Sequence, residues 1–320
     1  MKGIVTINSI HPQRAEHEAR KAQANRNELV MQIARAIRTD GRSEPLTGLR
    51  LHRESALTEC VHGISHLAFC VIAQGSKEVF IGDERYQYDP MHYLLVTAEL
   101  PVVSQIIEAS REQPFLSLCI RLDPTLVGSV MVEAGYASTH DRADVRAINV
   151  SPLDADLLDV VVRLMRLTDT PAEAPFLMPL IKREIIYRLL RGEQGDRLRQ
   201  MSVQEGHTHR IARAIQQLRE EFDQPLEVDD IAQELGMSVS SFYHHFKAVT
   251  ALSPLQYQKQ IRLQEARRLM LGEGLDAASA GYNVGYNDAS HFNREYKRLF
   301  GLPPLRDIER LREAASARPR

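Results

Sequence analysis

The spacing of apolar residues changes along the chain and predicts different elements in successive segments. Leu29, Ile33 and Ile37 recur every four residues near the N-terminus, which is typical of a short helix, and we expect it to stop near Asp40. Residues 11–27, which precede this helix, are polar and lack such a pattern. We therefore expect them to be frayed or exposed to solvent.

Short apolar runs separated by turn dipeptides such as Gly75-Ser76 and Asp89-Pro90 occupy residues 48–122. The predicted strands are Leu67–Ala73, Glu78–Ile81, Tyr93–Val96, Val102–Ile107 and Phe115–Leu122. Strands at such close and regular spacing predict an all-β barrel or jelly roll.

Helical periodicity follows the strands. An apolar stripe predicts one helix, made of Leu153, Leu157, Val160, Leu164 and Leu167. Prolines at positions 171, 175 and 179 should end it, and a second helix is expected from about Leu180 to Arg191. Residues 192–206 are polar and have the composition of a linker. The stripe is either core packed on the strands or a dimer interface, and the pattern leaves both open.

Residues from His207 onward have helical periodicity throughout. The first predicted helix ends near Gln224, and its apolar face consists of Ile211, Ile215, Leu218 and Phe222. A longer helix follows a capping box in which Ser253 precedes Pro254 and Gln256. Its roughly 18 residues, at about 1.5 Å each, give a rod of about 27 Å.

A helix-turn-helix pattern lies between these two helices. Such a unit needs a small residue where its helices cross and a residue tolerant of positive φ in the turn, and Ala232 and Gly236 supply them. Ser238 is a favourable N-cap for the second helix, which Phe242 and Phe246 anchor inward. The opposite, polar face suits contacts with DNA and comprises Ser240, Ser241, Tyr243, His244 and Lys247. An ordinary helical hairpin would have a similar pattern.

The same pattern recurs about fifty residues later, which raises its significance. Gly285 follows the first turn glycine by 49 residues, while Phe292, Tyr296 and Lys297 each follow their counterparts by 50. Asp288 is the expected cap of the second unit's recognition helix. The polar face of that helix comprises Ala289, Ser290, His291, Arg294 and Lys297. An in-register return of this kind indicates an internal repeat.

The length of 320 residues is sufficient for two domains. We expect one at 1–195, with a helical segment at 151–191, and a second at 205–312. The net charge of −2 is not that of a typical nucleic-acid-binding protein. Between Ser238 and Phe300, however, eight Lys or Arg face five Asp or Glu, an excess of three. Two recognition helices on a rod of this length suit successive major grooves, about 34 Å apart. We therefore predict sequence-specific binding of double-stranded DNA.

The cysteines and the N-terminus bear on the cellular setting. Cys60, Cys70 and Cys119 are too few and too widely spaced for a set of disulfides. We expect Cys70 and Cys119 to be inert, buried thiols, and for Cys60, beside Glu59, a structural role is favoured over reactivity. The sequence contains neither a signal-peptide pattern nor an apolar stretch near the ~20 residues of a membrane span. We expect a reducing, cytoplasmic, nucleoid-associated setting without membrane contact.

The repeated units resemble the DNA-binding domain of the AraC/XylS family over about a hundred residues. The first unit carries the likeness in residues 231–268, and the second in residues 284–301 followed by Pro303-Pro304. The family usually has Ile-Ala where this chain has Ala280-Gly281, so we expect weaker packing of that helix.

The N-terminal half resembles a family subgroup with a cupin-like domain, through residues 74–77, 82–83 and 86–90. The resemblance implies a two-domain α+β fold in which a cupin-like β-barrel with flanking helices precedes an all-α tandem helix-turn-helix domain. It also implies a small effector or partner protein sensed by the barrel, a homodimer, contact with RNA polymerase, and a role as transcriptional regulator, for which we expect activation.

Other functions are weighed against this hypothesis. His62 and His66 could belong to a metal site of the cupin kind, but further clustered ligands are missing, so we expect no metal and no cofactor. A cupin-type enzyme with a helical accessory domain is the first alternative, and the missing metal triad disfavours it. A protein-binding adaptor is the second, and the polar, cationic recognition faces disfavour it. We expect no enzymatic activity.

Overall fold

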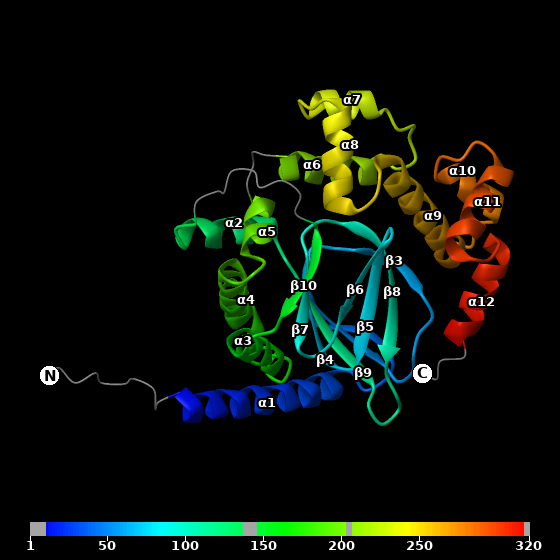
Figure 1. Cartoon of the computed structure of the whole chain (residues 1–320). Coiled ribbons are helices and arrows are strands. Elements are labelled where there is room, and N and C mark those ends of the chain that lie inside the picture. The colour runs from blue at the N-terminus through cyan, green and yellow to red at the C-terminus, as the bar shows by residue number, and fades with distance from the viewer. Residues whose placement is uncertain (1–10, 137–145, 203–206, 317–320) are drawn as a thin grey trace.

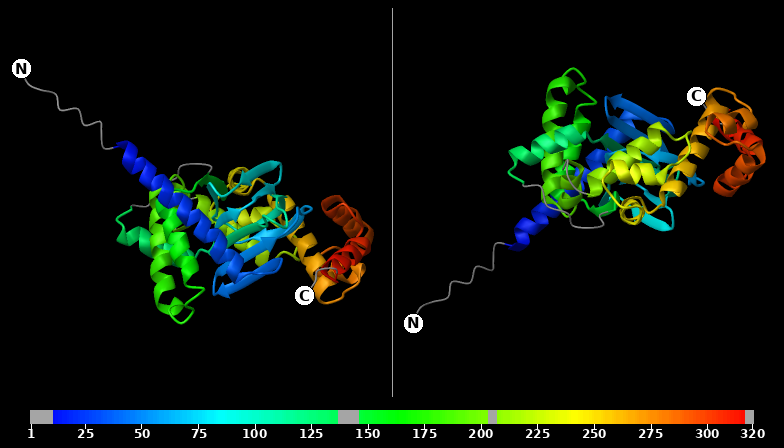
Figure 2. Two further views of the ribbon diagram at one scale, coloured as in Figure 1. Left: turned by 90° about the horizontal axis from the view of Figure 1, so that it is seen from below. Right: turned by 90° about the horizontal axis from the view of Figure 1, so that it is seen from above.

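The computed structural model describes residues 11–136, 146–202 and 207–316. Its strands lie at the centre, between a group of helices that follows them in the chain and the C-terminal helices (Figures 1 and 2). The strands are β1 (Gly41–Leu46), β2 (Leu49–Glu54), β3 (Val61–Ser65), β4 (Ala68–Gln74), β5 (Ser76–Ile81), β6 (Glu84–Tyr88), β7 (His92–Val96), β8 (Leu100–Glu108), β9 (Phe115–Arg121) and β10 (Ile148–Pro152). We call residues 41–152 the β-domain.

Two antiparallel sheets build the β-domain, in the orders β1-β2-β9-β4-β7-β10 and β3-β8-β5-β6. The five predicted strands are confirmed with small shifts of their ends. The prediction lacked β1, β2, β3, β6 and β10, because these strands are short and rich in polar residues. The finer expectation of a cupin-like barrel stays a prediction.

The central strands β4 and β7 of the six-stranded sheet are buried on both faces. Phe69 and Val71 of β4 point into a core shared with the flanking helices, whereas Cys70 and Ile72 point into the core between the two sheets. Alternate residues of a strand point to opposite faces, and so a strand covered on both sides is apolar throughout.

The helices that cover the six-stranded sheet differ from the prediction in several places. They are α1 (His11–Ala36), α2 (Pro124–Glu133), α3 (Ala155–Arg166), α4 (Ala174–Arg191) and α5 (Gly195–Ser202). Residues 11–27 are helical and not frayed, whereas the expected exposure to solvent holds for most of residues 18–27, with Ala22 and Asn25 as the buried exceptions. The predicted linker contains the helix α5, in which Leu198 is buried, so this part of the linker prediction was wrong. Residues 203–206 of the predicted linker lie outside the described residues.

The apolar stripe of α3 belongs to the core. Val160 and Leu164 are fully buried against the sheet and its neighbouring helices within a single chain. The second helix begins at Ala174, earlier than predicted, and contains Pro179. Pro179 therefore does not break the helix, whose buried side packs on the same core.

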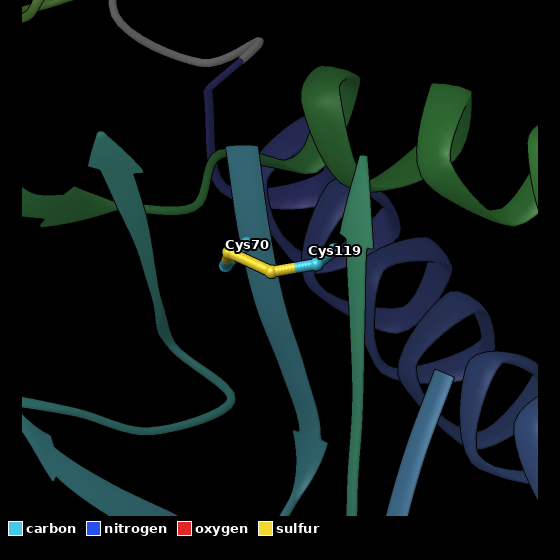
Figure 3. The surroundings of a disulfide bond; sticks show 2 residues. All are labelled: Cys70 and Cys119. Atoms are coloured by element: carbon cyan, nitrogen blue, oxygen red, sulfur yellow. A yellow bond between two sulfur atoms is a disulfide. The ribbon is translucent and has the colours of Figure 1, made fainter. Parts of the chain in front are cut away.

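Cys70 and Cys119 form a disulfide bond, which corrects the expectation of two free thiols (Figure 3). The two residues are register partners on the adjacent antiparallel strands β4 and β9, with Cα atoms 4.2 Å apart. Strand pairing brings them together across 49 residues of sequence, which spacing alone does not reveal. The cysteines therefore no longer support a reducing environment. Cys60 is free and exposed, with Sγ 3.7 Å from Oε1 of Gln105.

The C-terminal part is helical, as predicted. Its helices are α6 (His207–Glu220), α7 (Val228–Glu234), α8 (Val239–Thr250), α9 (Pro254–Gly272), α10 (Ala277–Asn283), α11 (Ala289–Phe300) and α12 (Pro304–Ser316). We call α7–α8 unit 1 and α10–α11 unit 2. Among the described helices, none is long and apolar enough to cross a membrane.

Candidate nucleic-acid interface

Unit 1 has the geometry that its sequence predicted. Gly236 joins α7 to α8 in the left-handed conformation, with φ of +62°. Ser238 caps α8, and its hydroxyl accepts a hydrogen bond from the backbone N–H of Ser241 at 3.2 Å. Phe242 and Phe246 are fully buried. Because these two rings fix one side of α8 inward, its opposite side faces solvent.

Unit 2 repeats this arrangement. Gly285 adopts φ of +86° between α10 and α11, and Asp288 caps α11 by accepting a hydrogen bond from the backbone N–H of His291 at 2.6 Å. Phe292 and Tyr296 are fully buried at the positions of the two phenylalanines of unit 1. The internal repeat therefore holds at the level of caps, turns and anchors.

The predicted DNA-contacting residues lie on the outer surfaces of the two recognition helices. In unit 1, Ser240, Tyr243, His244 and Lys247 are exposed, and Ser241 is partly buried at the cap. In unit 2, Ser290, His291, Arg294 and Lys297 are exposed, and Ala289 is partly buried. Within the described part of the chain, the side chains of Arg294, Lys247 and Lys297 form no ion pair or hydrogen bond. Their charges are thus available to phosphates or base edges.

Ala280-Gly281, the departure from the family pattern, produces close packing, and our expectation of a weakly packed helix was wrong. Gly281 is buried against the ring of Phe292, and a Cβ atom added to it would lie 2.9 Å from Cγ of that ring. In unit 1 the equivalent residue, Ala232, is also buried. Glycine thus lets α10 approach α11 where a methyl group would collide.

Helix α9 joins the units, and its capping box is confirmed. Ser253 accepts from the backbone N–H of Gln256, whose side chain accepts from the backbone N–H of Ser253. Sequence analysis missed Arg262, the residue of α9 that ties the turn of unit 2 to the segment following α6. Its guanidinium donates to the backbone oxygens of Phe222 at 2.6 Å and Gly285 at 3.0 Å. A partly buried arginine that binds carbonyls leaves no pattern of its own in the sequence.

Unit 1 packs against one end of the β-domain. The backbone N–H of Ala147 donates to the carbonyl of Val249 at 3.0 Å, and Arg146 donates to the carbonyl of Lys247 at 2.6 Å. The hydroxyl of Tyr257 donates to the backbone oxygen of Glu99 at 3.0 Å. The apolar core between the two sheets continues without a break into α6, unit 1 and α9. Sequence patterns gave no sign of this shared core.

Unit 2 contacts the β-domain through fewer groups. The ring of His62 on β3 lies edge-on to Phe300, with centroids 4.9 Å apart, and Arg310 of α12 forms an ion pair with Glu59. Burial, reinforced by the charge of Arg267, lowers the pKa of His62 to about 4. His62 is therefore neutral at physiological pH. The rest of unit 2 packs on its own small core.

Hollows lie in several places among the described residues, one of them between α3 and α4. A cavity of about 550 Å³ lies between the β-domain and α6, where Glu99, Arg197, His209 and Arg219 provide its charged and titratable lining along with Glu220. Other hollows lie within the β-domain itself. Within the described residues, no group of three or more His, Cys, Asp or Glu side chains is arranged to hold a metal ion.

Comparison with known proteins identifies both halves of the chain. The family model for the AraC-type transcriptional regulator N-terminus matches residues 45–197, and a helix-turn-helix domain model matches residues 231–310. The HTH-type transcriptional activator RhaS of Salmonella heidelberg (strain SL476) is 29% identical over 183 residues, which cover 56% of this chain and 60% of that protein. The HTH-type transcriptional regulator ArgR of Pseudomonas aeruginosa is 25% identical over 124 residues, covering 38% and 37%. The matches span less than two thirds of these relatives' lengths.

Solved structures share the two-domain arrangement. An apo form of ToxT from Vibrio cholerae strain SCE256 superposes with a TM-score of 0.52 at 11% identity, covering 83% of this chain and 98% of ToxT. ToxT from strain O395, bound to (E)-4-(8-methylnaphthalen-1-yl)but-3-enoic acid, gives a TM-score of 0.51 at 12% identity, covering 78% and 93%. At such identities the likeness establishes the fold alone.

The fold and the paired recognition helices define a two-domain helix-turn-helix protein with an N-terminal β-rich domain. The two family models together span most of the chain, and the chain belongs to the AraC/XylS family of transcriptional regulators.

Proposed function

We propose that this protein is a sequence-specific DNA-binding transcriptional activator. The observation that carries the proposal is the pair of capped, exposed recognition helices, which belong to two units joined by α9. Residues 205–312 contain both units and form the proposed DNA-binding domain. Matched relatives named as transcriptional activators support activation and, with it, contact with RNA polymerase.

The two faces differ, so binding should be asymmetric. In unit 2, Arg294 is the best candidate for a base contact, because a guanidinium can donate to O6 and N7 of guanine together. Lys247 and Lys297 lie further along their helices, where contact with phosphate is expected. The other exposed residues of the two faces complete the proposed surface: Ser240, Ser241, Tyr243, His244, Ala289, Ser290 and His291.

The test selects binding sites for the full chain from random DNA and compares variants on the selected site. Arg294→Ala should cost about 1–3 kcal/mol and relax preference at one base position. Lys297→Ala should weaken all sequences alike and lower the log–log salt slope by about one. Arg38→Ala is the control, because Arg38 is exposed just beyond α1. Recovery of no preferred sequence by the folded chain would contradict the proposal and favour the adaptor alternative.

Control by a small effector or partner protein sensed by the N-terminal domain is part of the proposal. The core shared by the β-domain and unit 1 supports it, because a rearrangement of the β-domain would disturb the packing of unit 1. ToxT, which shares the fold, has been solved with a small organic acid bound. An effector shifts the equilibrium only if it binds the two states with different affinity. We place the protein in the cytoplasm with the nucleoid, where its DNA target lies.

We also propose a homodimer, with a different surface from the α3 stripe. On α4, Phe176 is 76% exposed and Leu180 is 54% exposed, and Tyr187 further along is 40% exposed. Phe176→Asp with Leu180→Asp should yield folded monomers in sedimentation experiments. Val160→Asp should instead unfold the N-terminal domain, since it places a charge in the core. A monomeric unmodified protein at micromolar concentration would refute the dimer.

A further inference from the structure

A cationic hollow lies in the β-domain, apart from the DNA-contacting helices. Its volume is about 420 Å³, and its lining includes Arg42 of β1, His52 and Glu54 of β2, Lys77 of β5 and Ser104 of β8. A second hollow of about 210 Å³ shares most of these residues and extends between the sheets, past the Cys70–Cys119 disulfide.

The charges in this hollow are not balanced. Within the described part of the chain, neither Arg42 nor Lys77 forms an ion pair or hydrogen bond with another side chain. Burial, reinforced by the charge of Arg42, lowers the pKa of Lys77 to about 8. Glu54 is the acidic residue of the lining, and it is hydrogen-bonded to His52 at 3.3 Å. The charge of Arg42, which is exposed to solvent, opposes that of the half-buried Lys77, and an anion bound between them would relieve this repulsion.

The cavity between the β-domain and α6 differs in this respect. Its Arg219 forms an ion pair with Glu99, and the guanidinium of Arg197 donates to the backbone oxygen of Arg146 at 3.0 Å. These cations already have partners. An anionic ligand would therefore displace existing contacts there, whereas in the hollow of the β-domain it would supply missing ones.

We propose that the hollow of the β-domain binds a small organic anion, whose charged group is held by Arg42 and Lys77, and that this anion is the effector. The guanidinium offers two parallel donors to a carboxylate or phosphate, and the ammonium adds a third direction. The hydroxyl of Ser104 lies in the same lining. The effector role rests on the proposed regulatory function, while the anion site does not.

Strand β3 connects this site to unit 2 and to α6 of the C-terminal part. Val61 and His62 line the inner hollow, and the ring of His62 also contacts Phe300 of unit 2. At the end of the strand, His66 lies 2.7 Å from the carboxylate of Glu99, which pairs with Arg219 of α6. A ligand that moves β3 would therefore alter the docking of the DNA-binding domain on the β-domain.

The test uses the full chain and matched pairs of probes. Benzoate and glucose 6-phosphate carry the anion, and benzamide and glucose are their neutral counterparts. We expect at least one anion, at millimolar concentration, to raise the melting temperature and to bind in calorimetry, while its neutral counterpart does neither. Lys77→Met and Arg42→Met should each weaken binding by about tenfold or more, the equivalent of one hydrogen bond to a charged group.

Several results keep the test decisive. Lys77→Met should not lower the melting temperature of the ligand-free protein, because it removes an unpaired charge from a partly buried position. Arg38→Met, which lies outside the hollow, should bind the anion normally. Affinity should fall as the pH rises above about 8, where Lys77, faced by Arg42, His52 and Glu54, loses its proton. Equal binding of the neutral probes, unchanged binding by Lys77→Met, or no binding by either anion would overturn the proposal.

DNA binding is measured separately, so the two proposals can fail independently. Lys77→Met without ligand should bind the selected DNA site as the unmodified chain does. With ligand, only the unmodified chain should change its DNA affinity. If anions bind through Lys77 yet the chain binds no DNA, the anion site stands and the proposed regulatory function fails. If anions bind and DNA affinity does not change, the effector role is overturned.

Discussion

The two helix-turn-helix units share one sequence pattern but pack in different surroundings. Unit 1 belongs to a continuous apolar core that extends from α6 into the space between the two sheets. Unit 2 packs on a small core formed with α9 and α12. Phe300 of unit 2 contacts His62 of the β-domain, and Arg310 of α12 pairs with Glu59. The sequence repeat therefore specifies the same motif twice, whereas the tertiary structure determines what each copy packs against. Unit 1 is therefore joined to the β-domain through a shared core, and unit 2 through a contact at its edge.

The exposed faces of the two recognition helices also differ, in the number of cations that have no partner among the described residues. Unit 2 presents Arg294 and Lys297 without partners in the described part of the chain, whereas the face of unit 1 carries one such cation, Lys247. Phosphate contacts supply affinity that is independent of sequence. We infer that unit 2 supplies most of the electrostatic affinity, and that unit 1 adds contacts that depend on its docking.

Loss of the disulfide should have the largest effect on stability, and unit 1 and unit 2 should respond to it differently. Cys70→Ser with Cys119→Ser releases a loop of 49 residues, and the chain-entropy model gives a loss of stability of about 4 kcal/mol for such a loop. Because unit 1 shares the core of the β-domain, hydrogen exchange should speed up in α8 more than in α11. Equal acceleration in both helices would contradict the comparison.

The turn glycines offer a matched pair with a smaller effect. A Cβ atom on Gly285 would lie 2.1 Å from the backbone oxygen of Asp223, whereas one on Gly236 would meet no atom within 4 Å. Gly285→Ala adds a collision to the cost of a left-handed conformation, and we expect a loss of about 3 kcal/mol. Gly236→Ala should lose only about 1–2 kcal/mol. Chemical denaturation measures both, and equal losses would show that the turns are equivalent.

Helix crossing should be tighter in unit 2 than in unit 1. Gly281→Ala forces a methyl group against Phe292 and should destabilise the domain by about 2 kcal/mol despite the better helix propensity of alanine. Ala232→Gly in unit 1 should lose about 1 kcal/mol, mainly through helix propensity. Should Gly281→Ala prove stabilising, α10 and α11 are less closely packed than we describe.

The smallest expected effect is a pH dependence of the contact between unit 2 and the β-domain. The pKa of His62 is about 4 in the docked structure against 6.5 when the ring is free, so docking is favoured above pH 6.5. As the pH falls from 6.5 towards 4, His62 must gain a proton beside Arg267, and docking should weaken although Asp307 opposes this. Fluorescence transfer between dyes on the β-domain and α12 should report the opening. His62→Phe should abolish this pH dependence.

Local patterns were sufficient for the elements that local physics controls. The caps Ser238 and Asp288, the turns at Gly236 and Gly285, and the apolar anchors are set by neighbours within one or two turns of helix. The strands buried on both faces were equally visible, because they are apolar throughout. The outer faces of the recognition helices followed from the anchors, since a helix with one side fixed has its other side determined.

The partners of each surface were decided only by the tertiary structure. The Cys70–Cys119 bond depends on the register of β4 and β9, and the burial of the α3 stripe depends on the sheet that covers it. Arg262 acquires its role from carbonyls of segments that are distant in the sequence. Contacts between distant segments follow from how whole elements pack, and apolar periodicity records that a face is buried without recording what buries it.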